Sequence, residues 1–214
     1  MQLLVASNNR KKRAELEALL GPLGLEILTP EDVGGVEDVD EDQPTFAGNA
    51  AKKARAAALE KELWTLADDS GLEVEALEGA PGVYSARYAG THGDDGANNA
   101  KLLAELDGLP EKRRGARFVC ALALSSPSGK IVAELFGETA GRILTEARGQ
   151  GGFGYDPLFL FTEEGHAATD RVFAELAPDE KSAVSHRGRA LRALAELLPK
   201  VLPSPPHQPS GGEA

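Results

Sequence analysis

The sequence predicts a mixed α/β fold on three grounds. Short apolar runs of strand type alternate along the chain with segments of helical periodicity. Glycine-rich loops separate several of these elements, and no internal repeat or coiled-coil pattern interrupts them. The chain has 214 residues, of which 42% are hydrophobic, which is enough to bury a large core. We therefore expect one domain over residues 1–202.

The N-terminal quarter is predicted to run strand, helix, strand, helix. Residues 2–6 are a short apolar run, and the polar stretch SNNRKK follows it. Helical spacing comes next, at Leu16, Leu19, Leu20 and Leu23. A second strand is expected at 25–28. After an acidic loop, Thr45 is a candidate N-cap for an alanine-rich helix over residues 46–63.

The remaining elements follow the same alternation. Residues 63–67 are an apolar run, and residues 72–76 alternate apolar with acidic side chains, so we expect two further strands. A helix is expected over residues 97–106, before Gly108 and Pro110. Two apolar runs flank SPSG and predict a β-hairpin, and GQGGFGYDPLFLF predicts a glycine-rich loop leading into a strand. The hairpin strands are expected at Arg117–Ser125 and Lys130–Thr139. The last helix carries one apolar stripe: Leu191, Leu194, Ala195 and Leu198.

Composition excludes several classes of protein. The formal net charge of −11 argues against a nucleic-acid-binding surface, so an anionic ligand needs a local basic cluster. The single cysteine, Cys120, permits no intrachain disulfide and no cysteine-based metal site. No apolar run is long enough to span a membrane or serve as a signal peptide, so we expect a cytoplasmic protein. Residues 203–214, rich in Pro, Ser and Gly, are expected to be a disordered tail.

Two adjacent carboxylates, in the stretch ADDSG, are the first candidates for chemistry. Asp68 and Asp69 follow an apolar run, at what the sequence suggests is a strand leading into a turn. Successive strand residues point to opposite faces, so one acid can buttress the turn while the other enters a cleft. Beside phosphates such an acid needs a counter-charge, which Mg²⁺ supplies. The acidic loop over residues 37–42 offers a second carboxylate, from Glu41 or Asp40.

Basic side chains gather at two predicted helix starts. Lys11, Lys12 and Arg13 stand in a first helical turn, where cations are unfavourable unless they serve an anion together with backbone N–H groups. A solvated basic surface turn is the favoured explanation for this stretch taken alone, and the spacing is not that of a Walker A loop. In KSAVSHRGRAL, the last helix begins either after Ser185, as an N-cap, or near Pro178.

Two further stretches suit a flat ligand and its phosphates. In GGFGYDP, three glycines allow close backbone approach, and Phe153 or Tyr155 is placed to stack on a ring. A tight turn packed by its own aromatics is the alternative. Asn49 and Lys53 stand one turn apart on the alanine-rich helix, a spacing that is not specific by itself.

Taken in order, five segments resemble the inosine triphosphate pyrophosphatase family, also called dITP/XTP pyrophosphatases. They span about residues 2–198: ASNNRKK, TFAGNAAKKA, LADDSGLEVEALEGAPGVYSARYAG, GGFGYDPLF and KSAVSHRGRAL. The resemblance implies an elongated mixed sheet flanked by helices, with two lobes around a central nucleotide-binding cleft, and a homodimer. It also implies Mg²⁺-dependent hydrolysis of ITP, dITP or XTP to the monophosphate and pyrophosphate.

The resemblance assigns roles to the matching positions. Asp69 is the expected proton acceptor and a metal ligand, and Glu41 and Asp40 are further metal candidates. The residues expected to approach the phosphates are Ser7, Asn8, Asn9, Arg10, Lys11, Lys12 and Lys53. Ser70 is expected to contact the substrate. The expected base pocket is Phe153, Gly154, Tyr155 and Asp156, with Lys181, His186 and Arg187 holding and reading the nucleotide.

One position departs from the family pattern, and other functions remain open. Where the family commonly has a glutamate, this chain has Gly48, so the role of that acid passes to Glu41 or another carboxylate. A pyrophosphatase for modified pyrimidines or m7GTP-like nucleotides is an alternative, as is a nucleotide sensor without turnover. An aspartyl-phosphate phosphatase is disfavoured, because DDSG lacks the Asp-x-Asp spacing of such enzymes.

Overall fold

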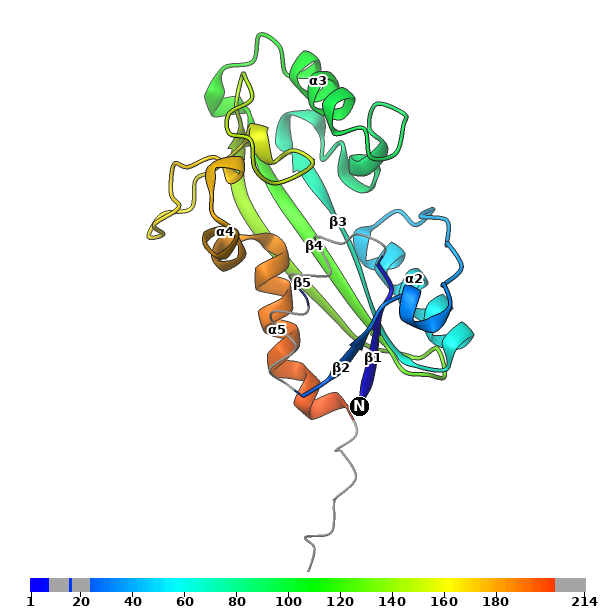
Figure 1. Ribbon diagram of the computed structural model, residues 1–214. Coiled ribbons are helices and arrows are strands. Elements are labelled where there is room, and N and C mark those ends of the chain that lie inside the picture. The colour runs from blue at the N-terminus through cyan, green and yellow to red at the C-terminus, as the bar shows by residue number, and fades with distance from the viewer. Residues whose placement is uncertain (8–15, 17–23, 203–214) are drawn as a thin grey trace, which may run out of the picture.

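The computed structural model describes residues 1–7, 16 and 24–202 of the chain (Figure 1). One six-stranded sheet runs through this part, in the order β2-β1-β3-β4-β5-β6. The strands are β1 (Gln2–Val5), β2 (Glu26–Leu28), β3 (Trp64–Val74), β4 (Gly115–Ser125), β5 (Ile131–Ile143) and β6 (Phe159–Phe161). β1 pairs in parallel with β2 and β3, whereas all later pairings are antiparallel. The predicted mixed α/β class is confirmed.

Helices cover the sheet on both faces. The α-helices are α2 (Phe46–Lys61), α3 (Asp95–Glu105), α4 (Pro178–Val184) and α5 (His186–Val201). Short 3-10 helices join them: η2 (Glu31–Val33), η3 (Glu75–Leu77), η4 (Gly82–Arg87), η5 (Glu111–Arg113), η6 (Asp156–Leu158) and η7 (Phe173–Glu175). In Figure 1, α2 and α5 flank the lower half of the sheet, while α3 and η4 lie at its upper end. Among the described residues, no helix combines the length and apolarity that a membrane crossing requires.

The alternation of side chains along β4 divides the lower core into two layers. Cys120, Leu122 and Leu124 pack against α5, whose buried leucines form one stripe. The intervening residues, Val119, Ala121 and Ala123, face α2. There the helix presents small side chains, at Ala50, Ala54, Ala57 and Ala58, which let its backbone approach the sheet closely. The buried environment predicted for Cys120 is confirmed.

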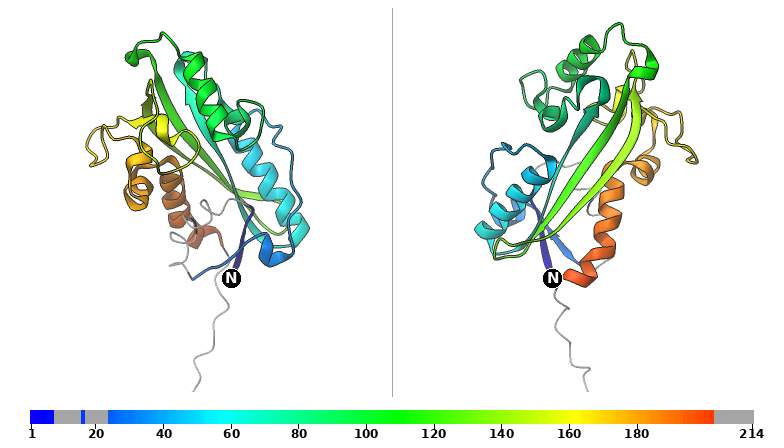
Figure 2. Two further views of the ribbon diagram at one scale, coloured as in Figure 1. Left: turned by 45° about the horizontal axis from the view of Figure 1, so that its top comes forward. Right: turned by 180° about the vertical axis from the view of Figure 1, so that it is seen from behind.

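A second core holds the upper lobe together. Its centre is an aromatic cluster in which Phe118 lies 4.5 Å from Phe159 and 5.8 Å from Phe173 between ring centroids. Leu72 and Val74 of β3 and Leu102 of α3 join the same cluster. The three long strands β3, β4 and β5 connect this lobe to the lower one, which Figure 2 shows from behind. A cleft between two lobes is therefore built on one continuous sheet.

One pair of predicted elements is wrong in its boundaries. The two strands predicted at 63–67 and 72–76 form one strand, β3 (Trp64–Val74), which runs through Asp68 and Asp69 without a turn, and residues 75–76 belong to η3. Every residue from Thr65 to Val74 pairs with β4, and these long-range hydrogen bonds outweigh the weak strand preference of DDSG. Of the two starts considered for the last helix, the one after Ser185 is confirmed, because α5 begins at His186 with Ser185 as its N-cap. The residues from Pro178 form a separate helix, α4, and Ser185 takes an extended conformation between the two helices.

The other elements agree with prediction to within a few residues. Thr45 caps α2, accepting a hydrogen bond from the backbone N–H of Gly48 at 3.1 Å. The hairpin, the β6 strand and the two short N-terminal strands are present. The helix predicted from Leu16, Leu19, Leu20 and Leu23 lies outside the described residues apart from Leu16, which is helical and buried. The predicted tail over residues 203–214 also lies outside them.

Candidate active site

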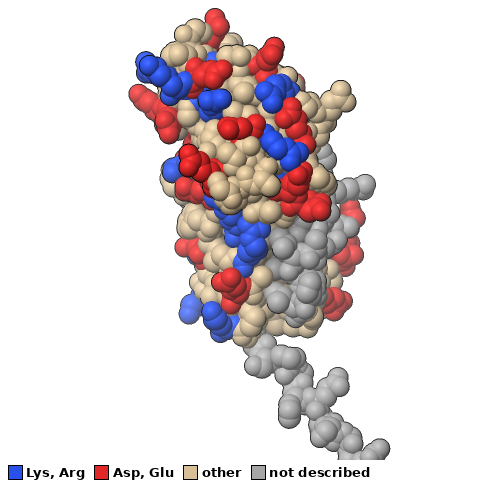
Figure 3. Space-filling model, turned by 90° about the vertical axis from the view of Figure 1, so that its left-hand side faces the viewer, with Lys and Arg blue, Asp and Glu red and all other residues tan. Residues whose placement is uncertain are grey.

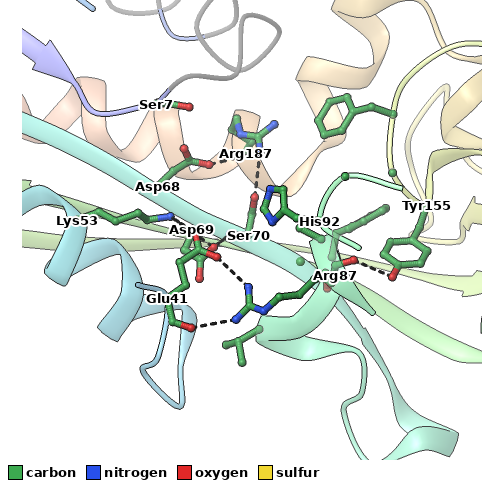
Figure 4. A pocket seen from close by; sticks show the side chains of 18 of the residues that line it. Ser7, Glu41, Lys53, Asp68, Asp69, Ser70, Arg87, His92, Tyr155 and Arg187 are labelled. Atoms are coloured by element: carbon green, nitrogen blue, oxygen red, sulfur yellow. Dashed lines mark hydrogen bonds and ion pairs between the residues drawn. The ribbon is translucent and has the colours of Figure 1, made fainter. Parts of the chain in front are cut away.

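A cavity of about 940 Å³ lies between the two lobes, and its shape follows from the different lengths of two strands. β1 ends at Val5, which pairs with Leu66, whereas β3 continues to Val74. Beyond Leu66, β3 therefore no longer has β1 as a neighbour along that edge, and this part of β3 lines the cavity. Side chains from both of its faces reach the opening, which explains how the consecutive residues Asp68 and Asp69 both line it (Figure 4).

Asp69 is held on the α2 side of β3. Its Oδ2 accepts a hydrogen bond from Asn49 Nδ2 at 3.0 Å, and its Oδ1 accepts one from the backbone N–H of Ser70 at 3.0 Å. The same Oδ1 lies 3.7 Å from Lys53 Nζ. The residue is 8% exposed. Because three donors surround it, the carboxylate has a fixed direction at the edge of the cavity.

Glu41 faces Asp69 from the acidic loop that precedes α2. Its carboxylate accepts hydrogen bonds from Lys53 Nζ at 2.9 Å and from Arg87 Nη1 at 3.1 Å. Arg87 Nη2 also donates to the backbone carbonyl of Glu41, at 2.9 Å. These contacts link the loop to η4 across the mouth of the cavity, as the dashed lines of Figure 4 show.

The charges in this cluster shift each other's pKa values. Burial is the largest influence on Glu41 and acts to raise its pKa, but Lys53 and Arg87 together hold the pKa below its usual 4.5. Burial likewise acts to lower the pKa of Lys53, but Asp69, Asp68 and Glu41 outweigh it and raise the pKa above 10.5. Lys53 is therefore a permanently charged bridge between two carboxylates.

Asp68 lies on the other face of β3, against the start of α5. Its Oδ2 is 3.5 Å from Arg187 Nη2, and the same nitrogen donates to Ser70 Oγ at 3.0 Å. The side chains of Asp68 and Arg187 are 5% and 4% exposed. Arg187 is placed by the N-cap of α5, where Ser185 Oγ accepts from the backbone N–H of Gly188 at 3.1 Å.

The glycine-rich loop over residues 150–156 forms the opposite wall. Phe153 is half-buried, and Lys181 Nζ lies 4.7 Å from its ring centroid. Arg187 Cζ lies 5.8 Å from the same centroid. Asp156 accepts a hydrogen bond from the backbone N–H of Phe153 at 2.8 Å and forms an ion pair with Lys181. A side chain at Gly152 would collide with this carboxylate, because its Cβ would lie 2.1 Å from Asp156 Oδ2.

Helix α3 clamps the same loop from outside. Asp95 accepts a hydrogen bond from the backbone N–H of Gly154 at 2.7 Å, and Asn99 Nδ2 donates to the Gly154 carbonyl at 2.9 Å. Both backbone groups of Gly154 are thus bonded to side chains one helical turn apart. The Tyr155 hydroxyl donates to the carbonyl of Ser85 at 2.9 Å, and the ring is 4% exposed. Burial raises the pKa of Tyr155.

Similarity to known proteins agrees with this geometry. The family profile described as "Ham1 family" matches residues 3–197. The chain belongs to the Ham1 family. A dITP/XTP pyrophosphatase of Desulforamulus reducens is 50% identical over 202 residues, covering 94% of this chain and 97% of the relative. A dITP/XTP pyrophosphatase of Mycolicibacterium paratuberculosis is 53% identical over 199 residues, covering 92% and 95%.

Solved structures of Ham1 proteins share the fold. The HAM1 protein from Coxiella burnetii superposes with a TM-score of 0.85 at 39% identity, covering 94% of this chain and all of the other. The Ham1 protein of Staphylococcus aureus gives a TM-score of 0.82 at 36% identity, covering 94% and 99%. The resemblance inferred from the five sequence segments is confirmed, as is the elongated sheet with flanking helices.

The Ham1 cavity brings together every site residue that was predicted within the described part of the chain. Asn8, Asn9, Arg10, Lys11 and Lys12 lie outside that part. The predicted residues that line the cavity are Ser7, Asp40, Glu41, Lys53, Asp69, Ser70, Phe153, Gly154, Tyr155, Asp156, Lys181, His186 and Arg187.

One of these predicted residues takes another position than a stacking role requires. Tyr155 is buried and bonded to Ser85, so it anchors the loop to η4, and Phe153 alone of the two is placed to stack on a ligand. His186 lies flat against Phe118, with 4.8 Å between ring centroids and 16° between planes, and is 7% exposed. Its ring therefore packs against the upper aromatic core.

Sequence reasoning missed Arg87 and His92, which also line the cavity. Arg87 lies within the segment LADDSGLEVEALEGAPGVYSARYAG, where it was given no role, and His92 lies just after that segment. The polar pair Ser85 and Arg87 in YSAR was the signal in the sequence that could have pointed to this part of the site. In the structure, Ser85 attaches η4 to β3. Its Oγ accepts from the backbone N–H of Leu72 at 2.9 Å.

Among the described residues, carboxylates outnumber cations in the cavity lining. Four described cations line it, at Lys53, Arg87, Lys181 and Arg187. More carboxylates do so: Glu37, Asp38, Asp40, Glu41, Asp42, Asp68, Asp69, Asp95 and Asp156. Other basic residues form surface ion pairs, and Figure 3 shows Lys and Arg interspersed with Asp and Glu over one face. The predicted cations Arg10, Lys11 and Lys12 lie outside the described part of the chain, so the expected basic cluster stays a prediction.

Proposed function

We propose that this Ham1-family chain hydrolyses the non-canonical purine nucleoside triphosphates dITP, XTP and ITP. The products are the nucleoside monophosphate and pyrophosphate, from cleavage of the bond between the α- and β-phosphates. The observation that carries the proposal is the cavity itself, where Asp69 and Lys53 lie on one wall and Phe153, Lys181 and Arg187 on the other. Relatives at about 50% identity over nearly the whole chain bear the name dITP/XTP pyrophosphatase.

The proposal includes Mg²⁺, and the residues present fit it. Within the described part of the chain, no group of three metal-binding side chains forms a complete protein site. Mg²⁺ is commonly held by one or two carboxylates together with substrate phosphates, and the carboxylates of Asp69 and Glu41 converge on the same Lys53 nitrogen. These two acids would hold the ion, with Asp40 as a third candidate. When bound, Mg²⁺ neutralises charge on the phosphates.

The chain's own residues then supply binding and proton transfer. Lys53, at the junction of both acids, is placed to donate to the phosphate chain, and Ser7 and Ser70, which also line the cavity, offer hydroxyl donors. Asp69 is placed to orient a water molecule and accept its proton. Its fixed direction, set by Asn49 and the Ser70 backbone, favours one approach of that water.

Base recognition is proposed for the opposite wall. The exposed side of Phe153 offers a stacking surface, and Lys181 and Arg187 hold that ring in place by cation–π contacts. A 6-oxo purine presents an acceptor where adenine presents an amino donor. Arg187 or backbone N–H groups of the loop favour the 6-oxo base, because adenine would leave these donors unpaired.

The direct test is to incubate the purified protein with dITP and Mg²⁺ and to identify the products. The proposal predicts dIMP with pyrophosphate, slower turnover of dATP, and no turnover when EDTA removes the metal. Asp69→Asn, which preserves size, is expected to lower kcat by about 100-fold or more. Release of inorganic phosphate with dIDP would refute the proposal, and so would preferred turnover of a modified pyrimidine or m7GTP-like substrate.

A homodimer and a cytoplasmic location belong to the same proposal. The support for the dimer is the resemblance to the family, and the support for the location is the nucleotide pool on which the proposed activity acts. Light scattering after size-exclusion chromatography tests the dimer. A mass of 22.5 kDa would refute it, because that is the mass of one chain.

A further inference from the structure

Asn49 lies at the bottom of the candidate site and makes two hydrogen bonds in opposite directions. Its Nδ2 donates to Asp69 Oδ2 at 3.0 Å. Its Oδ1 accepts from the backbone N–H of Gln43 at 3.0 Å. The side chain projects from the first turn of α2 and is 0% exposed. A buried amide with both ends satisfied has one orientation, because a flipped amide would oppose donor to donor and acceptor to acceptor.

The second of these bonds reaches the acidic loop. Gln43 lies two residues after Glu41, and the loop enters α2 through the Thr45 cap. The loop has further attachments on its outer side, where Lys52 donates to the Asp40 carbonyl at 3.0 Å and to Asp42 at 2.8 Å. Those contacts are exposed, whereas the hydrogen bond from Gln43 to the buried Asn49 side chain is part-buried. Asn49 thus holds the loop backbone from the inner side, in addition to the bonds that Lys53 and Arg87 make to Glu41.

Gly48 makes this close approach possible. A Cβ at position 48 would lie 2.8 Å from Gln43 Cβ and 3.2 Å from Thr45 Oγ1. Any other residue would push the loop away from the helix start. With glycine there, Gln43 comes within hydrogen-bond distance of Asn49, and Glu41 reaches Lys53 and Arg87.

We propose that Asn49 is a positioning residue that sets the placement of Glu41 relative to Asp69. One amide fixes the direction of the Asp69 carboxylate and, at the same time, the backbone from which Glu41 projects. Lys53 bridges the two carboxylates through their side chains, and Asn49 adds a second link that runs from the Asp69 carboxylate to the loop backbone at Gln43. The inference builds on the proposed function, since it concerns how the same two carboxylates are held for the reaction.

Two substitutions distinguish the contributions of the two hydrogen bonds that the Asn49 amide makes. Asn49→Leu is close in size and removes both hydrogen bonds. Asn49→Asp retains an acceptor for the Gln43 N–H but has no N–H to donate to Asp69. We expect both variants to lower kcat for dITP by about 10- to 100-fold with little change in KM, because the base wall and Lys181 are unaltered.

Amide hydrogen exchange, measured without metal or nucleotide, supplies a readout that does not depend on activity. Asn49→Leu is expected to lose protection at Gln43, whereas Asn49→Asp is expected to retain it. The matched control is Asn98→Asp on α3. Asn98 is also buried and bonds loop backbone, accepting from the Ala89 N–H at 2.7 Å, but none of its hydrogen bonds involves a carboxylate. This control is expected to leave Gln43 protection and kcat near wild type.

The possible outcomes test the inference and the proposed function separately. Unchanged Gln43 protection in folded Asn49→Leu, or unchanged kcat in either Asn49 variant, would overturn the inference. A wild-type protein that hydrolyses no nucleoside triphosphate would refute the proposed function, and the exchange measurement alone would then decide whether Asn49 fastens the loop. If Asn49→Leu does not fold, retained protection with lowered kcat in Asn49→Asp supports the positioning role, and wild-type kcat there refutes it.

Discussion

At the scale of single residues, Arg187 serves the stability of the fold as well as the candidate site. It is 3% exposed, bonds to Ser70 and faces Asp68 across 3.5 Å. The pair lies in the wall of the cavity, so its charges have lost most of their water. Removing one member of a buried pair costs more than the pair contributes, because the other charge remains without compensation.

Arg187→Ala is therefore expected to lower the free energy of unfolding by about 3–5 kcal/mol. It is also expected to reduce the preference for dITP over dATP. Urea unfolding measures the first effect, and kcat/KM for the two nucleotides measures the second. A double variant that adds Asp68→Asn should be more stable than Arg187→Ala alone, because it removes the uncompensated charge. Wild-type stability together with an unchanged nucleotide preference would contradict both roles.

Glu41 makes stability depend on pH in a defined direction. Its pKa in the folded chain is below the ordinary value of 4.5 because of Lys53 and Arg87, although burial opposes them. A carboxyl group whose pKa is depressed by folding stabilises the fold above its unfolded pKa. That contribution is lost as the pH falls through the folded pKa.

The stability difference between wild type and Glu41→Gln is thus expected to shrink as the pH falls from about 6 to about 3. Urea unfolding without metal at several pH values checks this. Glu175→Gln is the comparison on the surface: Arg148, at 3.4 Å, and the Val172 N–H also lower the pKa of Glu175, so the same trend is expected there but smaller, because water screens the interaction. A difference that is constant or grows on acidification would show that Glu41 is not stabilised by these cations.

At the scale of elements, β3 depends on glycine where it crosses under η4. A Cβ at Gly71 would lie 2.4 Å from Ser85 Oγ and 2.8 Å from both the Gly82 carbonyl and Phe46. Ser85 in turn bonds the β3 backbone at Leu72. The close crossing places η4, and with it Arg87, at the edge of the cavity.

Gly71→Ala is expected to destabilise the chain by about 1–3 kcal/mol or more, because η4 must move or the strand must bend. The control is Gly96→Ala in α3, where the nearest atom to an added Cβ is 3.6 Å away and alanine favours a helix. Thermal unfolding of both variants checks the prediction. Equal melting temperatures for the two would show that the crossing is not tight.

The sequence predicted those elements whose conformation depends on residues within the same element. It did not predict those whose conformation depends on pairing with residues far away in the chain. Thr45 as a cap, the alanine face of α2 and the hairpin all follow from residues within one element. The stretch DDSG has poor strand propensity, and only its register with β4 makes it strand. Likewise, the burial of Tyr155 depends on Ser85, 70 residues earlier, which no local pattern reports.

At the scale of the whole molecule, the position of the cavity follows from the topology. The short β1 stops at Val5, the long β3 continues between the lobes, and the loops before α2 and before η6 close on it from two sides. The sequence motifs predicted which residues gather there, because each of the five segments contributes residues to the cavity lining. They did not predict the excess of acids, since charge balance depends on which side chains converge in space.

The central claim is the proposal that the cavity acts on a nucleoside triphosphate together with a divalent cation. The most direct measurement is hydrolysis of dITP with Mg²⁺ in ¹⁸O-labelled water, followed by mass spectrometry of the products. Attack of water on the α-phosphorus, with Asp69 accepting its proton, predicts one ¹⁸O atom in dIMP and unlabelled pyrophosphate. Label in pyrophosphate, or in inorganic phosphate released beside dIDP, would contradict the account.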